Sequence, residues 1–161
     1  MSALTAWSYS RYADHTRCPL YFKEKYITKS IKDESSDAMK RGNDIHVGIA
    51  AFLKGTAQGV PRDALQNPRA EQIISELSQI PDKLVEQQWG FTSSWTETAW
   101  FSKDPSKPTW WRVILDVGLV YPDLTGEALD WKTGKRYATN ADQMELNALG
   151  MMCKVKPIKH V

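Results

Sequence analysis

The 161-residue sequence has only two cysteines, Cys18 and Cys153, and no long apolar run. Two thiols are too few for a disulfide scaffold or a four-cysteine metal site, so we expect both to be reduced and buried. No segment approaches the roughly 18 apolar residues of a membrane span, and the polar N-terminus lacks the apolar core of a signal peptide. These absences predict a cytoplasmic protein without a membrane partner.

An excess of charge of either sign is also lacking. The sequence has 21 lysines and arginines against 19 aspartates and glutamates, which gives a formal net charge of +2. This balance does not by itself point to a nucleic-acid or membrane partner, so any electrostatic recognition must come from local patches. The length and the 42% of hydrophobic residues are those of one globular domain, which we expect to cover residues 1–161.

Helical periodicity dominates the first half of the sequence. We expect two short helices near the N-terminus and two longer ones at about residues 37–54 and 68–80. Asp37 is the expected N-cap of the first long helix. On that helix Gly42 and His46 are four residues apart and therefore share a face.

The second half has the alternating, β-branched and aromatic pattern of strands. It predicts four strands, at about residues 84–91, 96–101, 110–120 and 127–133, and a closing helix that begins at Asn140. Residues beyond this helix have the pattern of another strand that stops early, which predicts a chain shortened at its C-terminus. Together the elements predict an α/β domain with a central mixed β-sheet of four or five strands, flanked by helices.

Each of two apolar strands carries a carboxylate, Asp116 in VILDVG and Asp130 in ALDWKTG. Such a group is costly unless it is paired or bound to a metal. Antiparallel pairing would bring the two acids together, and strand alternation places Lys132 on the same face as Asp130, with Trp131 pointing away. A divalent cation such as Mg²⁺ or Mn²⁺ would relieve the repulsion between the acids. The alternative is a plain cross-strand ion pair between Asp116 and Lys132 on a solvated face.

Two acids, a divalent cation and an amine support the hydrolysis of phosphodiesters. The cation would polarise the phosphoryl oxygen and lower the pKa of a bound water, while Lys132 would orient or deprotonate that water. Metal-dependent hydrolysis is therefore the chemistry that we expect of this pair of strands.

Several short motifs, in their order along the chain, resemble the PD-(D/E)XK nucleases. Within that superfamily the chain looks like the branch similar to RecB and AddB nuclease domains and to many phage exonucleases. The motifs are Ser8-x-Ser10-Arg11 with Cys18-Pro19-x-x-Phe22, Gly42-x-x-x-His46, Asp116, Asp130-x-Lys132-Thr133-Gly134, and Asp142-Gln143 at the start of the last helix. The resemblance covers residues 8–150 and implies a restriction-endonuclease-like core.

The resemblance also implies a role for each matching residue. The expected metal ligands are His46, Asp116, Asp130 and the carbonyl of Trp131. Mg²⁺ would be the cofactor, and Mn²⁺ would substitute for it. Lys132 would be the catalytic lysine, Gln143 would hydrogen-bond near the active site or the DNA backbone, and Arg11 would support the site or contact a phosphate.

The sequence departs from this pattern at two places. The family helix commonly reads Gln-x-x-x-Tyr, whereas here the fifth place is Asn147. Cys18 matches the first of four iron–sulfur cysteines in some relatives, but Cys153 is the only other cysteine in the sequence. We therefore expect no iron–sulfur cluster in this chain.

Further side chains have both a functional interpretation and a purely structural one. Glu86, at the start of the first strand, is expected to add a second metal or water contact, or else to be a solvated edge residue. Lys135 and Arg136 follow the catalytic strand and would line a phosphate path unless they are simply solvated. Six of the seven tryptophans lie between Trp89 and Trp131, where core packing is favoured over base stacking.

The expected function is Mg²⁺-dependent DNA hydrolysis of an exonuclease-like kind, in DNA repair, recombination or phage DNA processing. The setting implied by the resemblance is the cytoplasm of a bacterium or of a phage-infected host cell. DNA is the expected partner, with an oligomer or a larger repair complex left open. Two alternatives are a catalytically silent nucleic-acid-binding module and an interaction subunit whose nuclease fold is completed inside a larger machine.

Overall fold

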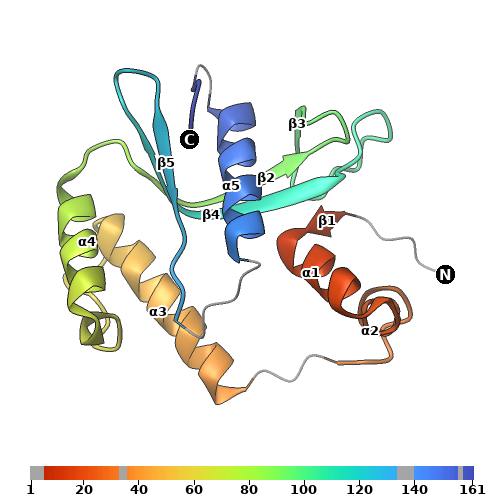
Figure 1. Ribbon diagram of the computed structural model, residues 1–161, viewed down its shortest axis with the longest axis horizontal. Helices are drawn as coiled ribbons and strands as arrows, with labels where there is room; N and C mark the ends of the chain where they lie inside the picture. Colours follow the sequence, from red (N-terminus) through yellow and green to blue (C-terminus); the bar gives the residue numbers. More distant parts are fainter. Residues whose placement is uncertain (1–5, 33–35, 134–139, 156–157) are drawn as a thin grey trace.

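The computed structural model describes residues 6–32, 36–133, 140–155 and 158–161 (Figure 1). Within them a five-stranded mixed sheet is flanked by helices, as the sequence predicts. The strands are β1 (Trp7–Ser8), β2 (Leu84–Phe91), β3 (Glu97–Thr98), β4 (Trp111–Val120) and β5 (Gly126–Leu129). β4 pairs with β1 in parallel, and with β2 and β5 in antiparallel orientation. β4 is therefore the strand around which the sheet is organised.

The helices of the described residues follow the predicted order. They are α1 (Tyr9–Arg17), α2 (Pro19–Phe22), α3 (Asp37–Leu53), α4 (Pro68–Gln79) and α5 (Asn140–Lys154), with a π-helical turn at Lys23–Ile27 and a 3₁₀ turn at Ala64–Gln66. Ser36 caps α3 by accepting from the backbone N–H of Met39 at 3.2 Å, so the expected cap at Asp37 is wrong by one residue. Asp37 opens the helix instead, where a carboxylate also favours the helix dipole.

Three strand predictions differ from the structure. Of the strand expected at residues 96–101, only β3 is present. The strand expected at residues 127–133 corresponds to β5, which ends at Leu129. The C-terminal residues form only an isolated bridge between Thr125 and His160, and residues 156–157 lie outside the described part. β1, with two residues, was not predicted because it is too short to show a periodic pattern.

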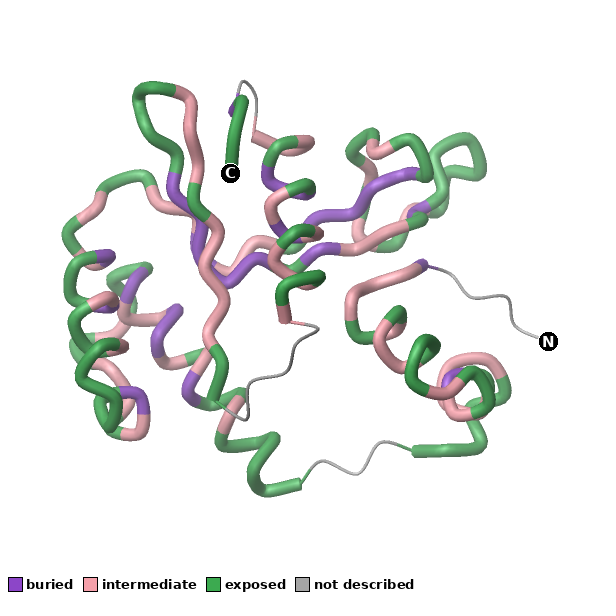
Figure 2. Tube along the Cα trace, viewed as in Figure 1, coloured by how far each residue is buried: buried purple, intermediate pink, exposed green. Residues whose placement is uncertain are grey.

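Two clusters of buried side chains form the core. In the first, α3 and α4 pack with Val117 and Leu119 of β4; in the second, Met151 of α5 packs with Val113 and Leu115. All five residues from Leu115 to Leu119 are buried, so the centre of β4 is covered on both faces (Figure 2). None of the described helices has the combined length and apolar character that crossing a bilayer requires.

We predict that Leu115→Ala, at a fully buried position of β4, lowers the free energy of unfolding by about 2–5 kcal/mol, because the lost methyl groups leave a cavity. Ile114→Ala is the matched control, since the neighbouring Ile114 side chain is 45% exposed. Denaturant unfolding followed by tryptophan fluorescence measures both changes. Equal losses in the two variants would contradict this account of the core.

Candidate active site

A cleft of about 740 Å³ lies between α3 and the centre of the sheet. Its lining includes Gly42 and His46 of α3, Glu86 of β2, Asp116 of β4 and Thr133, which follows β5. The cleft is therefore built by segments far apart in the sequence.

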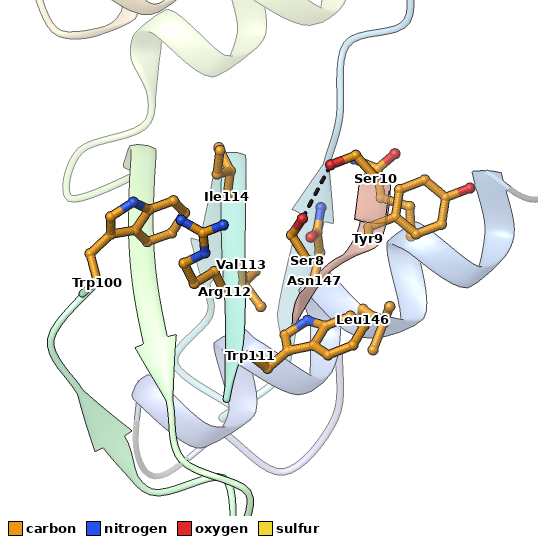
Figure 3. Close-up of a pocket in the computed structure, with 11 residues that line it drawn as sticks. Ser8, Tyr9, Ser10, Trp100, Trp111, Arg112, Val113, Ile114, Leu146 and Asn147 are labelled. Carbon is orange, nitrogen blue, oxygen red and sulfur yellow. Dashed lines mark hydrogen bonds between the residues drawn. The ribbon is translucent and has the colours of Figure 1, made fainter. Parts of the chain in front are cut away.

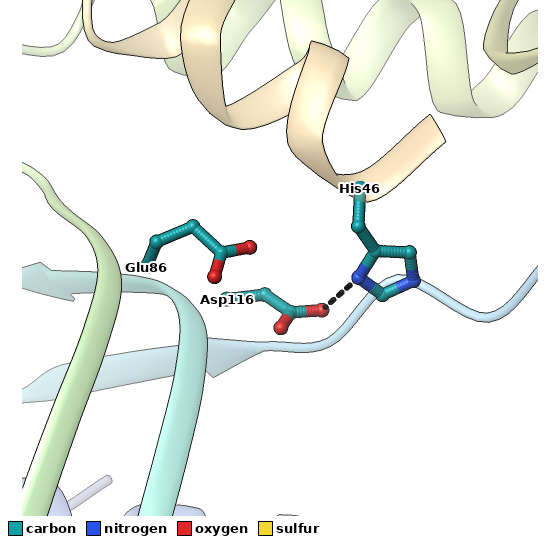
Figure 4. A group of neighbouring side chains, drawn as sticks. All are labelled: His46, Glu86 and Asp116. Atoms are coloured by element: carbon teal, nitrogen blue, oxygen red, sulfur yellow. Dashed lines mark ion pairs between the residues drawn. The ribbon is translucent and has the colours of Figure 1, made fainter. Parts of the chain in front are cut away.

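His46, Glu86 and Asp116 meet in this cleft (Figure 4). One ligand atom from each lies within 4.8 Å of the others, and the imidazole Nδ1 of His46 is 3.2 Å from Oδ2 of Asp116. The hydrogen bond to Asp116 raises the pKa of His46. Burial, followed by the neighbouring charge of Asp116, raises the pKa of Glu86. Two crowded carboxylates and an imidazole are a donor set that suits a divalent cation.

An unusual backbone conformation places Glu86 in this group. Its φ angle of 51° lies in the left-handed region, although Glu86 is inside β2. The paired residues on either side, Val85 with Val117 and Gln87 with Leu115, put Glu86 opposite Asp116. A non-glycine residue in this conformation costs on the order of 1–3 kcal/mol, and such strain concentrates at functional sites. Glu86 is half-buried and lines the cleft, and its role as a metal contact stays a prediction.

The carboxylate of Asp116 is fixed by two neighbours. Its Oδ2 accepts from the backbone N–H of Trp131 at 2.8 Å, besides the contact with His46. Residue 131, two positions after the end of β5 at Leu129, thus donates its N–H to a side chain of β4. The backbone contact of Trp131 with the site is thus made by its N–H, and the ligand role of its carbonyl stays a prediction.

Asp130, Lys132 and Gln143 form a second connected group. Gln143 donates from Nε2 to Oδ1 of Asp130 at 2.7 Å, and its Oε1 accepts from Nζ of Lys132 at 2.7 Å. Lys132 also forms an ion pair with Oδ2 of Asp130. Burial raises the pKa of Asp130, whose side chain is 5% exposed. The alternative of an ion pair between Lys132 and Asp116 is therefore wrong, because the partner of Lys132 is Asp130.

The two groups are neighbours but do not form one cluster. Among the described residues the compact donor group contains Glu86 and leaves out Asp130. The charge of Asp130 nevertheless acts on His46, and the charges of Asp130 and Asp116 act on each other. The sequence placed Asp130 in the ligand set and Glu86 beside it, whereas the structure brings Glu86 closer. A ligand role for either residue stays a prediction.

Gly42 allows the segment after Lys132 to approach α3. A Cβ atom at position 42 would lie 2.9 Å from Oγ1 of Thr133, which is closer than real contacts of this kind. The small size of Gly42, four residues before His46, therefore leaves room for Thr133 in the wall of the cleft.

The other predicted residues lie elsewhere. Arg11 donates from Nη1 to the carbonyl of Ala6, and its guanidinium lies 5.1 Å from the centre of the Tyr26 ring. Lys135 and Arg136 lie outside the described residues. The exposed fraction is 5% for Trp89, which belongs to the core, and 52% for Trp110, which lies at the surface.

The thiols were expected to be buried, but both cysteines are half-buried. The reason is visible at Cys18, where the sulfur caps the first turn of α2. It accepts from the backbone N–H of Tyr21 at 3.5 Å.

The family profile described as the PD-(D/E)XK nuclease superfamily matches residues 6–151. The chain therefore belongs to the PD-(D/E)XK nuclease superfamily, whose members are usually metal-dependent nucleases. This finding supports the superfamily, while the RecB-like branch remains a resemblance. Among curated proteins and among solved structures, none matches the chain.

We predict that Gly42→Ala weakens Mn²⁺ binding, because the new methyl group meets Oγ1 of Thr133 and so shifts α3, which carries the expected ligand His46. Gly59→Ala is the matched control, since a Cβ atom there meets nothing within 4 Å. Isothermal titration calorimetry measures the Mn²⁺ affinity. The double variant Gly42→Ala/Thr133→Ala should regain affinity because it lacks Oγ1, and failure of this rescue would disprove the contact as the cause.

Proposed function

We propose that the protein is a Mg²⁺-dependent deoxyribonuclease that hydrolyses phosphodiester bonds, with Mn²⁺ able to replace Mg²⁺. The observation that carries this proposal is the cluster of His46, Glu86 and Asp116 beside the group of Asp130 and Lys132. Membership of the PD-(D/E)XK superfamily supports a nuclease with a nucleic-acid substrate. An exonuclease-like mode, a role in cytoplasmic DNA repair, recombination or phage DNA processing, and assembly into a larger complex remain predictions from the resemblance.

The donor set fits a hard divalent cation. His46, Glu86 and Asp116 would hold the ion, and Asp130 would face it from the edge of the cluster. When bound, the ion would supply charge for the phosphoryl oxygen and a more acidic water. The protein itself supplies the fixed positions, because Asp116 is held by the N–H of Trp131 and Glu86 by its strand.

Lys132 is oriented by its two partners. Its Nζ donates to Oε1 of Gln143 and forms an ion pair with Oδ2 of Asp130. We infer that Lys132 orients a water or a phosphate oxygen and offsets negative charge in the transition state. Gln143 is a positioning residue in this account, because it links Lys132 to Asp130.

We predict that Lys132→Ala abolishes cleavage and leaves DNA binding within about threefold, because the ammonium acts mainly on the reacting groups. The assay uses linear and circular DNA, single- and double-stranded, with Mg²⁺, Mn²⁺ or EDTA. Lys29→Ala, an exposed lysine after α2, is the matched control and should cleave like the wild type. Cleavage in EDTA would contradict a metal mechanism, and binding without any cleavage by the wild type would favour a catalytically silent binding module.

We predict that Asp116→Asn and Glu86→Gln each weaken Mn²⁺ binding by at least about tenfold, since each removes one anionic ligand. Glu71→Gln on α4, an exposed carboxylate, serves as the control. Calorimetric titration of the three variants gives the affinities. An unchanged Mn²⁺ affinity in Asp116→Asn would exclude that residue as a ligand, and the same result for Glu86→Gln would return it to a structural role.

A further inference from the structure

One face of the sheet stays open where β2 and β4 run on beyond the candidate active site. Starting at the acids, three pairs of facing residues follow one another on this face: Glu86 with Asp116, Gln88 with Ile114, and Gly90 with Arg112. Gln88 and Ile114 line the cleft together with the acids. Ile114 is 45% exposed, whereas Val113, on the opposite face, is 2% exposed. The open face therefore leads from the acids towards Arg112.

The rings of Trp100 and Phe101 lie at the far end of this row. The guanidinium of Arg112 is 4.9 Å from the ring centre of Trp100 and 4.8 Å from that of Phe101. Figure 3 shows the Arg112 side chain beside the Trp100 ring, in a cavity of about 490 Å³ that Ile114 also lines. Phe101 is 60% exposed. We call Trp100, Phe101 and Arg112 the aromatic platform; through Ile114 it adjoins the cleft.

Backbone contacts hold the two rings of the platform over the sheet. Gly90 faces Arg112 across the strands, and a Cβ atom at position 90 would overlap the backbone carbonyl of Ala99. The hydroxyl of the buried Thr109 donates to the same carbonyl at 2.9 Å and accepts from the backbone N–H of Ser102 at 2.7 Å. The segment that carries the rings is thus fixed on both sides of them, although the rings themselves are not fully buried.

The guanidinium of Arg112 lacks an acidic partner within the described part of the chain. Its Nε is buried without a hydrogen-bond partner, and no described carboxylate forms an ion pair with it. Burial, followed by the nearby charge of Arg11, lowers the pKa of Arg112. A guanidinium that is held by aromatic rings and has no counter-charge favours an anion such as a phosphate group.

An exposed aromatic ring beside such a guanidinium suits an unpaired strand of nucleic acid. A base stacks on the ring, and the phosphate beside it pairs with the arginine. In a duplex the faces of the bases are stacked on one another, so only an unpaired strand offers them to a protein. Duplex binding relies on many phosphate contacts, and the formal net charge of +2 gives it less support.

We propose that the aromatic platform binds an unpaired stretch of the substrate strand, with a base stacked on Phe101 and a neighbouring phosphate paired with Arg112. The inference rests on the proposed function and deepens it, because the strand would run from the platform past Ile114 to the acids. Arg112 and Asp116 are four positions apart in β4, a rise of roughly 13 Å. The stacked base would therefore lie a few nucleotides from the cleaved bond.

The first test compares a single-stranded oligonucleotide with its duplex, in EDTA so that neither metal nor cleavage contributes. We expect Phe101→Leu to weaken single-strand binding at least about fivefold and to leave duplex binding within about twofold, because it keeps apolar bulk but loses the ring. The slope of log affinity against log salt should stay unchanged in Phe101→Leu. In Arg112→Gln, which loses one phosphate contact, the slope should shrink by about 0.7.

Tyr121→Leu is the matched control. Tyr121 is an aromatic residue that is 37% exposed and follows β4 at the end opposite to Arg112. Its variant therefore loses a ring away from the platform and should bind both forms of DNA like the wild type. Because Phe101 is exposed, Phe101→Leu should keep the unfolding temperature of the wild type, which separates a lost contact from a damaged fold.

The second test changes the DNA instead of the protein. Single bases are removed, one at a time, as abasic sites along the single-stranded oligonucleotide. We expect one or two adjacent positions at which the missing base weakens binding by the wild type but not by Phe101→Leu, because the variant has already lost the stacking contact. Equal losses for the two proteins at every position would overturn the stacking proposal.

The platform proposal and the proposed function fail in different ways. If the wild type cleaves DNA while Phe101→Leu binds the single strand as tightly, or loses single-strand and duplex affinity equally, the platform proposal alone is overturned. Smaller species of Phe101→Leu in sedimentation, with unchanged single-strand affinity, would assign the rings to a contact between copies of the chain and overturn it too. If the wild type neither binds nor cleaves DNA, the proposed function fails and the platform proposal fails with it.

Discussion

The burial of Asp116 in the middle of β4 is the constraint on which the rest of the site depends. The side chain is 7% exposed, and both of its neighbours along the strand are buried. A carboxylate in such a place requires partners, and the chain supplies the N–H of Trp131 and the imidazole of His46. A second carboxylate, that of Glu86, lies in the same group and adds repulsion. The arrangement is thus compatible with a cation among these side chains.

Local backbone features bring the distant segments together around Asp116. Gly42 admits Thr133 to the side of α3, where Thr133 lines the cleft. Glu86 adopts a left-handed conformation opposite Asp116, and the chain leaves β5 after Leu129. Each of these departs from regular helix or strand packing, and each serves the same cleft. This concentration of irregular features favours a functional interpretation over a purely structural one.

The sequence predicted the elements with long periodic patterns and the residues of the motifs. The helices from Asp37 and from Asn140, the strands β2 and β4, and the closeness of His46 to Asp116 all agree with the structure. The sequence did not predict features that arise only in three dimensions. The two-residue strand β1, the positive φ of Glu86 and the hydrogen bonds that link Lys132 and Asp130 through Gln143 leave no periodic signal in one sequence.

In the proposed site, one divalent ion binds between the acids and the imidazole. This is tested by a crystal structure of the wild-type protein soaked with Mn²⁺, with the ion located by its anomalous scattering. We expect a peak bonded to Asp116 and His46, with Glu86 or Asp130 completing the ligands and Lys132 beside it. A structure that binds Mn²⁺ elsewhere, or that leaves His46 and Asp116 hydrogen-bonded to each other at saturating Mn²⁺, would contradict it.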